Sequence, residues 1–289
     1  MVIENCLILS AGKGTRMGKI GEVLPKPLWP IGKETLLSYQ YKLAKKIGAK
    51  KIHINISHQA DLIRKYVEDN NFDLIVHYEH ELLDVGGTIQ NLVNLGVKGN
   101  CLIINSDQLL QTHVSTFLSL INQQKLKNIA TLFSVTVTSS ERYNRFKTID
   151  GNLVSITKFG EHDFHQNETY SGIGVVNLDR IKLDFDISER NFFKLLFKNL
   201  SDSKIQVINL GDNFFYDLGT REKYIEFLFT QNINQKFPEL SLSEYFIEGF
   251  YNFGKHHISK AAAGSVIIDG NVNDINGKII FYQGLIDQL

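Results

Sequence analysis

The chain has 289 residues, of which 43% are hydrophobic and 21% charged, and 31 basic side chains balance 31 acidic ones. This length suits one large α/β domain with an appendage, or two modest domains. The balanced charge argues against partners that bind through a broad positive field, namely nucleic acid and anionic membrane surfaces. Any recognition of phosphate by this chain must therefore depend on a few placed cations.

Cysteine usage and hydropathy favour the cytoplasm as the location of the protein. Cys6 and Cys101 each lie in an apolar run, so two buried free thiols are expected, and no C-x-x-C metal spacing is present. No stretch reaches the roughly 18–20 apolar residues that cross a bilayer. The short apolar segment before Gly12 lacks the features of a signal peptide.

The first 112 residues alternate apolar runs with helical patterns. The run at 3–10 leads directly into glycines, as a buried parallel strand does. Strands that alternate with helices at short intervals predict βαβ units and a mostly parallel sheet flanked by helices. The predicted elements are strands at 3–10, 51–56, 73–78 and 101–105, and helices at 35–47 (capped by Gly48), at 59–69 and after the glycines at 86–87.

Residues 113–230 carry a different pattern. Asp150-Gly151 between two extended runs predicts a β-hairpin. We interpret 1–112 as a nucleotide-binding half and 113–230 as an acceptor-binding half of one mixed sheet. The predicted elements are a helix at 113–122, strands at 129–137, 145–149, 153–158, 173–178, 205–209 and 213–216, and helices near 189–199 and from Thr220.

The remaining residues, 231–289, are expected to form a C-terminal extension. This segment is rich in Asn and Gln and ends in short Ile- and Val-rich pieces punctuated by glycine. Such a pattern is typical of a β-solenoid, but a solenoid core normally needs about three repeats. One or two solenoid turns and plain hairpins are both left open.

A glycine-rich segment, S-A-G-K-G-T-R, directly follows the first strand. Gly12 and Gly14 allow the backbone to approach a phosphate and to point its N–H groups at the anion. Lys13 and Arg16 add positive charge. The spacing of these glycines differs from that of the P-loop and of the dinucleotide-binding G-x-G-x-x-G motif. Two interpretations of the segment remain, a phosphate-binding loop of another kind and a plain turn.

A P-K-P segment at 25–27 follows this loop. Its two prolines are expected to fix an extended backbone around Lys26 and so to hold the ammonium group in place. A stiffened cation opposite a glycine loop is the arrangement that a transferring phosphoryl group requires.

Residues 11–28, A-G-K-G-T-R-M-G-K-I-G-E-V-L-P-K-P-L, resemble the sugar-nucleotidyltransferases (nucleoside-diphosphate-sugar pyrophosphorylases), and looser similarity continues to about residue 230. The resemblance implies a Rossmann-like, GT-A-like fold and nucleotidyl transfer from an NTP to a sugar 1-phosphate with release of pyrophosphate. It also implies that Arg16 holds the triphosphate and that Lys26 contacts the α-phosphate and the acceptor phosphate. The loop residues that would bind the nucleotide are Ala11, Gly12, Lys13, Gly14 and Thr15.

Two aspartates are the candidate metal ligands. Asp107 follows the strand at 101–105, and ligands of parallel sheets bind at the carboxyl ends of the strands, although a helix N-cap is an alternative. Asp217, in F-F-Y-D-L-G-T, also ends a predicted strand. The family has one aspartate after the central strand and another in a D-x-G-T step, both on magnesium, so the resemblance implies Mg²⁺ at this pair. Ser106 here replaces the glycine that usually precedes the first aspartate.

The expected chemistry is in-line attack by the acceptor's phosphate oxygen on the α-phosphorus. That oxygen is already anionic, so the step needs no general base and depends on positioning and charge neutralisation. The resemblance implies that Gly86 and Gly87 lie at the edge of the nucleobase. Asp84 departs from the family pattern, which often has a small or hydroxyl-bearing residue at this position.

The acceptor side departs most from the family pattern. Lys158, in S-I-T-K-F, resembles the lysine of the family's I-x-E-K-P, which touches the sugar phosphate, but Thr157 and Phe159 replace the glutamate and the proline. Gly172 matches a family glycine that lies against the sugar.

Two alternative functions stay open. One is cytidylyl transfer to phosphocholine or another phosphorylated alcohol, because the acceptor motif is altered. The other is a non-catalytic regulatory subunit that binds a sugar nucleotide. The expected partners are an NTP and a phosphorylated small molecule, with no nucleic acid and no membrane, and a homo-oligomer is left open.

Overall fold

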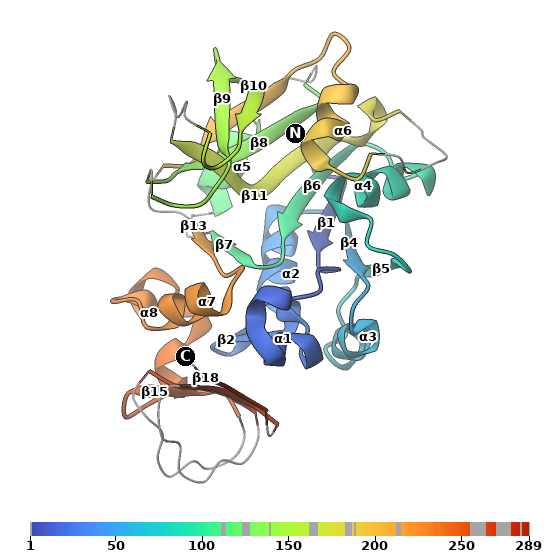
Figure 1. The fold of residues 1–289 in the computed structure, drawn as a ribbon. Helices are drawn as coiled ribbons and strands as arrows, with labels where there is room; N and C mark the ends of the chain where they lie inside the picture. The colour runs from blue at the N-terminus through green and yellow to red at the C-terminus, as the bar shows by residue number, and fades with distance from the viewer. Residues whose placement is uncertain are drawn as a thin grey trace.

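The computed structural model describes residues 2–110, 114–122, 128–138, 140–161, 167–182, 187, 189–211, 215–254, 264–269, 279–283 and 285–288. A nine-stranded mixed sheet forms its centre (Figure 1). The strands of this sheet are β1 (Asn5–Leu9), β4 (Lys51–Ile56), β5 (Ile75–Tyr78), β6 (Asn100–Asn105), β8 (Ala130–Thr136), β9 (Arg145–Ile149), β10 (Asn152–Thr157), β11 (Glu168–Asn177) and β12 (Ile205–Asn209).

The strand order is β5-β4-β1-β6-β11-β8-β12-β10-β9, and only β11 and β10 run against the other strands. The four strands from the first 112 residues are all parallel, whereas β11 joins them to the second half through antiparallel pairs with β6 and β8. The predicted α/β fold with a mixed, mostly parallel sheet is therefore confirmed.

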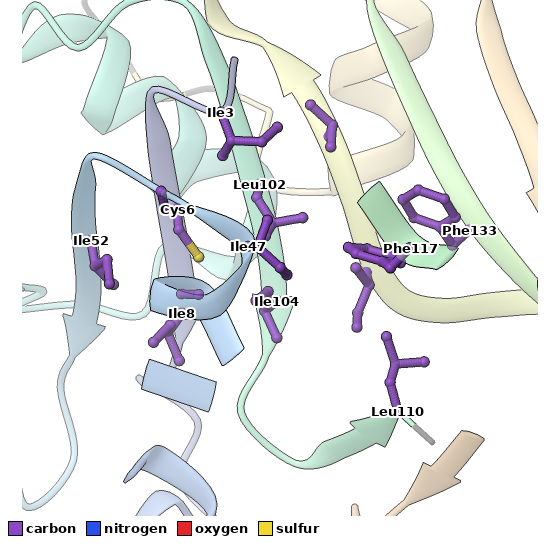
Figure 2. Close-up of a cluster of buried hydrophobic side chains, with 14 of the residues drawn as sticks. Ile3, Cys6, Ile8, Ile47, Ile52, Leu102, Ile104, Leu110, Phe117 and Phe133 are labelled. Carbon is purple, nitrogen blue, oxygen red and sulfur yellow. The ribbon is translucent and has the colours of Figure 1, made fainter. Parts of the chain in front are cut away.

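Helices cover both faces of this sheet. On one face α2 (Leu36–Ile47), α3 (Ala60–Asp69) and α5 (Val114–Asn122) pack on a buried aliphatic cluster. Figure 2 shows Cys6 and Ile8 of β1, Leu102 and Ile104 of β6, and Phe117 and Phe133 in this cluster. On the other face α4 (Asp84–Asn94) and α6 (Phe192–Lys198) cover a second cluster.

Local sequence signals explain several boundaries. Thr35 caps α2 through a reciprocal capping box with Ser38, and Gly48 ends the helix with φ 87°. Asp150 and Gly151 both have positive φ, as a two-residue turn between antiparallel strands requires, so the predicted hairpin of β9 and β10 is confirmed. Cys6 and Cys101 are buried free thiols, as expected.

Several short elements, among them the 3₁₀ turns and the smallest strands, were not predicted. Two 3₁₀ turns, η1 (Thr15–Met17) and η2 (Lys26–Leu28), flank helix α1 (Gly18–Val23). A two-stranded antiparallel ribbon joins β7 (Gln108–Leu110) to β13 (Phe215–Asp217), and α7 (Arg221–Leu228) follows β13. Helix α1 and β7 were not predicted, whereas β13 and α7 correspond to the predicted strand at 213–216 and the predicted helix from Thr220. The small remaining elements are β2 (Pro30–Ile31), β3 (Glu34–Thr35), η3 (Leu178–Arg180), α8 (Ile233–Lys236), η4 (Pro238–Leu240) and η5 (Leu242–Tyr245).

The C-terminal residues form a separate five-stranded sheet. Its strands are β14 (Phe246–Ile247), β15 (Phe250–Asn252), β16 (Val266–Asp269), β17 (Ile279–Tyr282) and β18 (Leu285–Gln288), in that order. The inner strands β15, β16 and β17 run parallel, as successive solenoid turns do, whereas β14 and β18 pair antiparallel as hairpins. The predicted glycine-punctuated segment at 270–278 lies outside the described residues.

The C-terminal sheet packs against α1 and the P-K-P region rather than against the nine-stranded sheet (Figure 1). Val266 and Ile280 share a buried cluster with Ile20 of α1, with Trp29 and with Tyr224 of α7. The C-terminal extension therefore shares a buried cluster with Met17 and Ile20, the residues that follow the glycine loop in the chain. Among the described residues, no helix combines the length and apolarity needed to cross a bilayer.

Candidate active site

The β7–β13 ribbon brings Asp107 and Asp217 together. Asp217 is paired with Gln108, and the Leu218 N–H donates to the Asp107 carbonyl at 2.8 Å. A methyl group placed on Gly219 would lie 2.7 Å from Asp217 Oδ1 and 3.4 Å from Asp107 Oδ2. The same point is 3.3 Å from Arg16 Nη2. Two carboxylates and a guanidinium therefore converge on one place, and only a glycine leaves it open.

Lys26 completes this group of charges. Its ammonium donates a hydrogen bond to Asp107 Oδ2, and the side chains of both residues are 14% exposed. The expectation of an extended backbone around Lys26 is wrong. Pro25 alone is extended, whereas the next residues form η2, in which Leu28 N donates to the Pro25 carbonyl at 2.9 Å. The fixed φ of Pro27 suits such a turn, so the prolines stiffen the segment in a different conformation.

Asp217 is held by two further side chains. Its Oδ2 accepts hydrogen bonds from Lys223 Nζ at 2.6 Å and from Tyr143 Oη at 2.7 Å, while Oδ1 accepts from the Gly219 N–H at 2.9 Å. Burial by itself would raise the pKa of this carboxyl, but the Lys223 and Tyr143 hydrogen bonds lower it below its usual value. Asp217 is therefore ionised with one oxygen directed toward the convergence point.

A cavity of about 510 Å³ opens beside these charges at the carboxyl ends of β1 and β6. One wall belongs to the glycine loop and the residues around Asp107, and the opposite wall carries Tyr170 and α6 aromatics. Asp217 lines a smaller neighbouring hollow of about 160 Å³ with Tyr143 and Lys223. Predicted site residues that line the large cavity are Ala11, Gly12, Arg16, Lys26 and Asp107.

The glycine loop contains a backbone conformation that only glycine adopts readily, as its sequence predicts. Gly14 has φ 67°, a conformation that favours glycine, and its carbonyl accepts a hydrogen bond from Met17 N at 2.8 Å. The side chains of Lys13 and Thr15 are exposed at the turn into η1. Arg16 lies within η1 and reaches back to the two aspartates.

A buried polar cluster forms the far end of the cavity. Glu79, 3% exposed, accepts hydrogen bonds from Thr88 Oγ1 at 2.6 Å and from Asn55 Nδ2 at 3.0 Å. Asn55 in turn accepts from the Ser10 N–H at 2.8 Å. This cluster connects the start of the glycine loop to β4, β5 and α4.

Gly86 and Gly87 lie inside the first turn of α4 rather than before it. Both are buried, and the Gly86 N–H donates to the Arg190 carbonyl at 2.8 Å. A Cβ on Gly86 would lie 2.7 Å from that carbonyl oxygen. The two glycines therefore allow the segment before α6 to pack closely, and a contact with the base stays a prediction.

The two acceptor-side candidates occupy different places. Gly172, with φ 77°, lies at an irregularity of β11 where a Cβ would overlap Gln108 Oε1 at 1.1 Å. It thus packs next to the Asp107 turn. Lys158 is exposed, its N–H donates to Glu161 at 3.0 Å, and it is not among the described residues that line the large cavity.

Residues 5–232 match the sequence profile of the family described as nucleotidyl transferase. The chain belongs to this family. The predicted family and enzyme class are therefore confirmed, and the matched region ends close to the expected start of the C-terminal extension.

Individual relatives agree with this membership. The nucleotidyltransferase is 27% identical over 227 residues to D-glycero-α-D-manno-heptose 1-phosphate guanylyltransferase of Campylobacter jejuni, covering 77% of this chain and 97% of the relative. It is 22% identical to the enzyme of that name from Aneurinibacillus thermoaerophilus, over 75% and 94% of the two chains. Its fold resembles the inositol-1-phosphate CTP transferase of T. maritima, with a TM-score of 0.64, 15% identity and coverage of 83% and 97%.

Sequence reasoning missed three polar contributors to the site. Tyr143, in the loop before β9, and Lys223, in α7, both hold Asp217 although they are far apart in the chain, and no local motif marks them. Glu79 was not predicted as a site residue, although an acidic residue directly after β5 is a signal that could have identified it. Each of these residues gains its role through a long-range contact.

The donor set fits a hard divalent cation. Two carboxylate oxygens converge near a guanidinium, and Mg²⁺ prefers one or two carboxylates together with waters and substrate phosphates. Within the described ranges, no cluster of three or more His, Cys, Asp or Glu side chains forms a metal cage. The arrangement therefore suits a cation that a substrate helps to bind.

Proposed function

We propose that this nucleotidyltransferase transfers the nucleotidyl group of an NTP to a sugar 1-phosphate in a Mg²⁺-dependent, in-line reaction that releases pyrophosphate. The convergence of Arg16, Asp107 and Asp217 on the open space at Gly219, beside Lys26, carries the proposal. Cations for phosphate oxygens and acids for a metal lie within one site at the edge of the large cavity.

Each residue has a distinct task in this reaction. The N–H groups and cations of residues 11–16 bind the triphosphate, and Arg16 stabilises the leaving pyrophosphate. Lys26 moves its hydrogen bond from Asp107 to the α-phosphate and the acceptor phosphate and draws the two anions together. Asp107 and Asp217 would hold the Mg²⁺, which supplies charge neutralisation at the α-phosphate.

Guanine is the base that the cavity favours. Asp84 is exposed and lines this cavity with a carboxylate acceptor, and the edge of guanine carries adjacent N–H donors that such a group can bind. The two heptose 1-phosphate guanylyltransferases among the relatives support the same choice. We therefore infer GTP and a heptose 1-phosphate as the substrates.

The test crosses the four NTPs with heptose, glucose and N-acetylglucosamine 1-phosphates and measures pyrophosphate release with Mg²⁺. The expected result is the highest kcat/KM for GTP with the heptose phosphate. Equal turnover of all sugar phosphates would remove the acceptor assignment. Absence of pyrophosphate with every pair would favour a regulatory subunit that binds without turnover.

A second candidate is cytidylyl transfer to a phosphorylated alcohol. Its support is the altered acceptor segment, in which Lys158 is exposed away from the large cavity and Thr157 and Phe159 replace the family residues. CTP with phosphocholine or inositol 1-phosphate is therefore included in the same assay. Turnover of these pairs above all sugar phosphates would replace the first assignment.

A further inference from the structure

A second cavity, of about 550 Å³, lies at the opposite end of the parallel strands, and we call it the rear cavity. It is lined by Asn5 and Lys51, the first residues of β1 and β4, whereas the active-site cavity begins at Leu9 at the far end of β1. Leu9 lies four residue steps along the extended strand from Asn5, a distance of about 13 Å. The rear cavity is thus distinct from the catalytic one.

The wall of the rear cavity carries an excess of positive charge. Lys50, Lys51 and Lys98 line it, together with a single carboxylate, Glu4. None of the three lysines forms an ion pair with another described side chain. Glu4 Oε2 already accepts a hydrogen bond from the Asn100 N–H at 2.7 Å. Three lysines against one carboxylate leave the described lining of the cavity with an excess of two positive charges.

Two stacked histidines and an asparagine form an ordered hydrogen-bond chain in this cavity. Asn5 Nδ2 donates to the Lys98 carbonyl at 2.7 Å, which directs Asn5 Oδ1 toward His53 Nε2 at 3.1 Å. Because Oδ1 only accepts, His53 must carry its proton on Nε2. Its Nδ1 then accepts from His77 Nε2 at 2.8 Å. This chain fixes both rings and gives the site a preformed polar wall.

We propose that the rear cavity is a second binding site, for a small phosphate-type oxyanion. Lys50, Lys51 and Lys98 all line this cavity, and their ammonium groups can form strong charge-assisted hydrogen bonds with the several acceptor oxygens of such an anion. His77 is paired in register with Asn55 on the neighbouring strand, and Asn55 belongs to the polar cluster at the far end of the active-site cavity, so this pair of residues links the two cavities.

The test follows the histidine side-chain NMR signals of the full chain during titration with inorganic phosphate, and in a second arm with glycerol 1-phosphate. The expected result is a saturable shift of the His77 and His53 signals. The double variant Lys51→Met/Lys98→Met should weaken this binding roughly tenfold or more, because two charge-assisted contacts are lost. The two arms distinguish free phosphate from a phosphate ester.

Three comparisons make the result decisive. The control Lys46→Met/Lys194→Met removes two exposed lysines elsewhere and should leave the phosphate affinity unchanged. Lys26→Met should also leave the phosphate-induced histidine shifts unchanged, because Lys26 lines the active-site cavity and not the rear cavity. Unchanged far-UV circular dichroism and an unchanged urea unfolding midpoint show that each variant is folded. Equal phosphate affinity in Lys51→Met/Lys98→Met, or loss of all binding in Lys26→Met, would overturn the proposal.

Discussion

The ammonium of Lys26 donates a hydrogen bond to Oδ2 of Asp107, so the P-K-P segment is joined directly to the residue that follows the central strand β6. Both side chains are largely buried, so each charge depends on the other for compensation. A cation assigned to the substrate phosphates thus lies in contact with an acid assigned to the metal. Changes at either residue are expected to affect both stability and chemistry.

Replacing Lys26 with methionine should lower kcat by about 10²–10³-fold, because one preorganised cation is lost from the transition state. It should also lower the free energy of unfolding by about 1–3 kcal/mol, because Asp107 loses its charged partner. Pyrophosphate release and urea unfolding measure the two effects. Lys46→Met, an exposed lysine on α2, is the matched control and should change neither.

The substitutions Asp107→Asn and Asp217→Asn should each reduce turnover by at least about 10²-fold, since each removes one anionic oxygen from the proposed metal site. Calorimetric titration with Mg²⁺ and a non-hydrolysable NTP should show weaker metal binding in both. The double variant should be little worse than either single variant, because the two acids act as a unit. Full activity in both single variants contradicts the metal assignment.

Lys223→Met should raise the pKa of Asp217, because the hydrogen bond from Lys223 is a main cause of its lowered value. Catalysis requires the ionised carboxylate, so the acidic limb of the pH–rate profile should move to higher pH. The profile of Lys236→Met is the comparison, since Lys236 donates to Tyr216 Oη and to no described carboxylate. An unmoved acidic limb in Lys223→Met argues against Asp217 as the titrating group.

Gly172→Ala should be strongly destabilising, because φ is 77° and the new methyl group would overlap Gln108 Oε1. Displacement of Gln108 also disturbs the neighbouring Asp107, so turnover should fall as well. Gly48→Ala is the matched control: its φ is 87°, but the added methyl group meets open space, so only the backbone cost of about 1–2 kcal/mol applies. Equal losses of unfolding free energy would show that steric overlap at Gly172 is unimportant.

The pH dependence of stability should report on His53. Burial, together with the nearby His77 and Lys51, lowers the pKa of His53 from 6.5 to about 4. Between these values the unfolded chain binds a proton that the folded chain excludes, so stability is complete above pH 6.5 and falls as pH decreases toward 4. Urea unfolding between pH 7 and 5 should show this loss, and His53→Gln should flatten it. A parallel slope in both proteins would exclude His53 as the cause.

Periodic and capping signals allowed most of the fold to be predicted. The apolar run at β1, the Thr35 and Gly48 boundaries of α2 and the Asp150-Gly151 hairpin each follow from forces that act within a few residues. The β7–β13 ribbon could not be predicted as a pair, because two three-residue strands carry no periodic pattern. Their pairing is set by the packing of residues more than a hundred positions apart.

The charged residues of the candidate site were predicted from the sequence, but the residues that hold them in place were not. Arg16, Lys26 and the two aspartates stand in recognisable local motifs, and the structure brings them together. The conformation at Lys26 was wrong because proline fixes φ but leaves more than one ψ open. The role of Tyr143 could not be predicted, because its hydrogen bond to Asp217 depends on the tertiary fold alone.

The β7–β13 ribbon also determines when the two proposed metal ligands can come together during synthesis of the chain. Asp107 emerges from the ribosome together with the glycine loop and most of the parallel strands, but its partner Asp217 follows only after the whole second half has been translated. Closing so long a segment is slow relative to local helix formation. A nascent or truncated chain that ends before β13 carries the glycine loop without the second proposed metal ligand, so we expect it not to consume NTP.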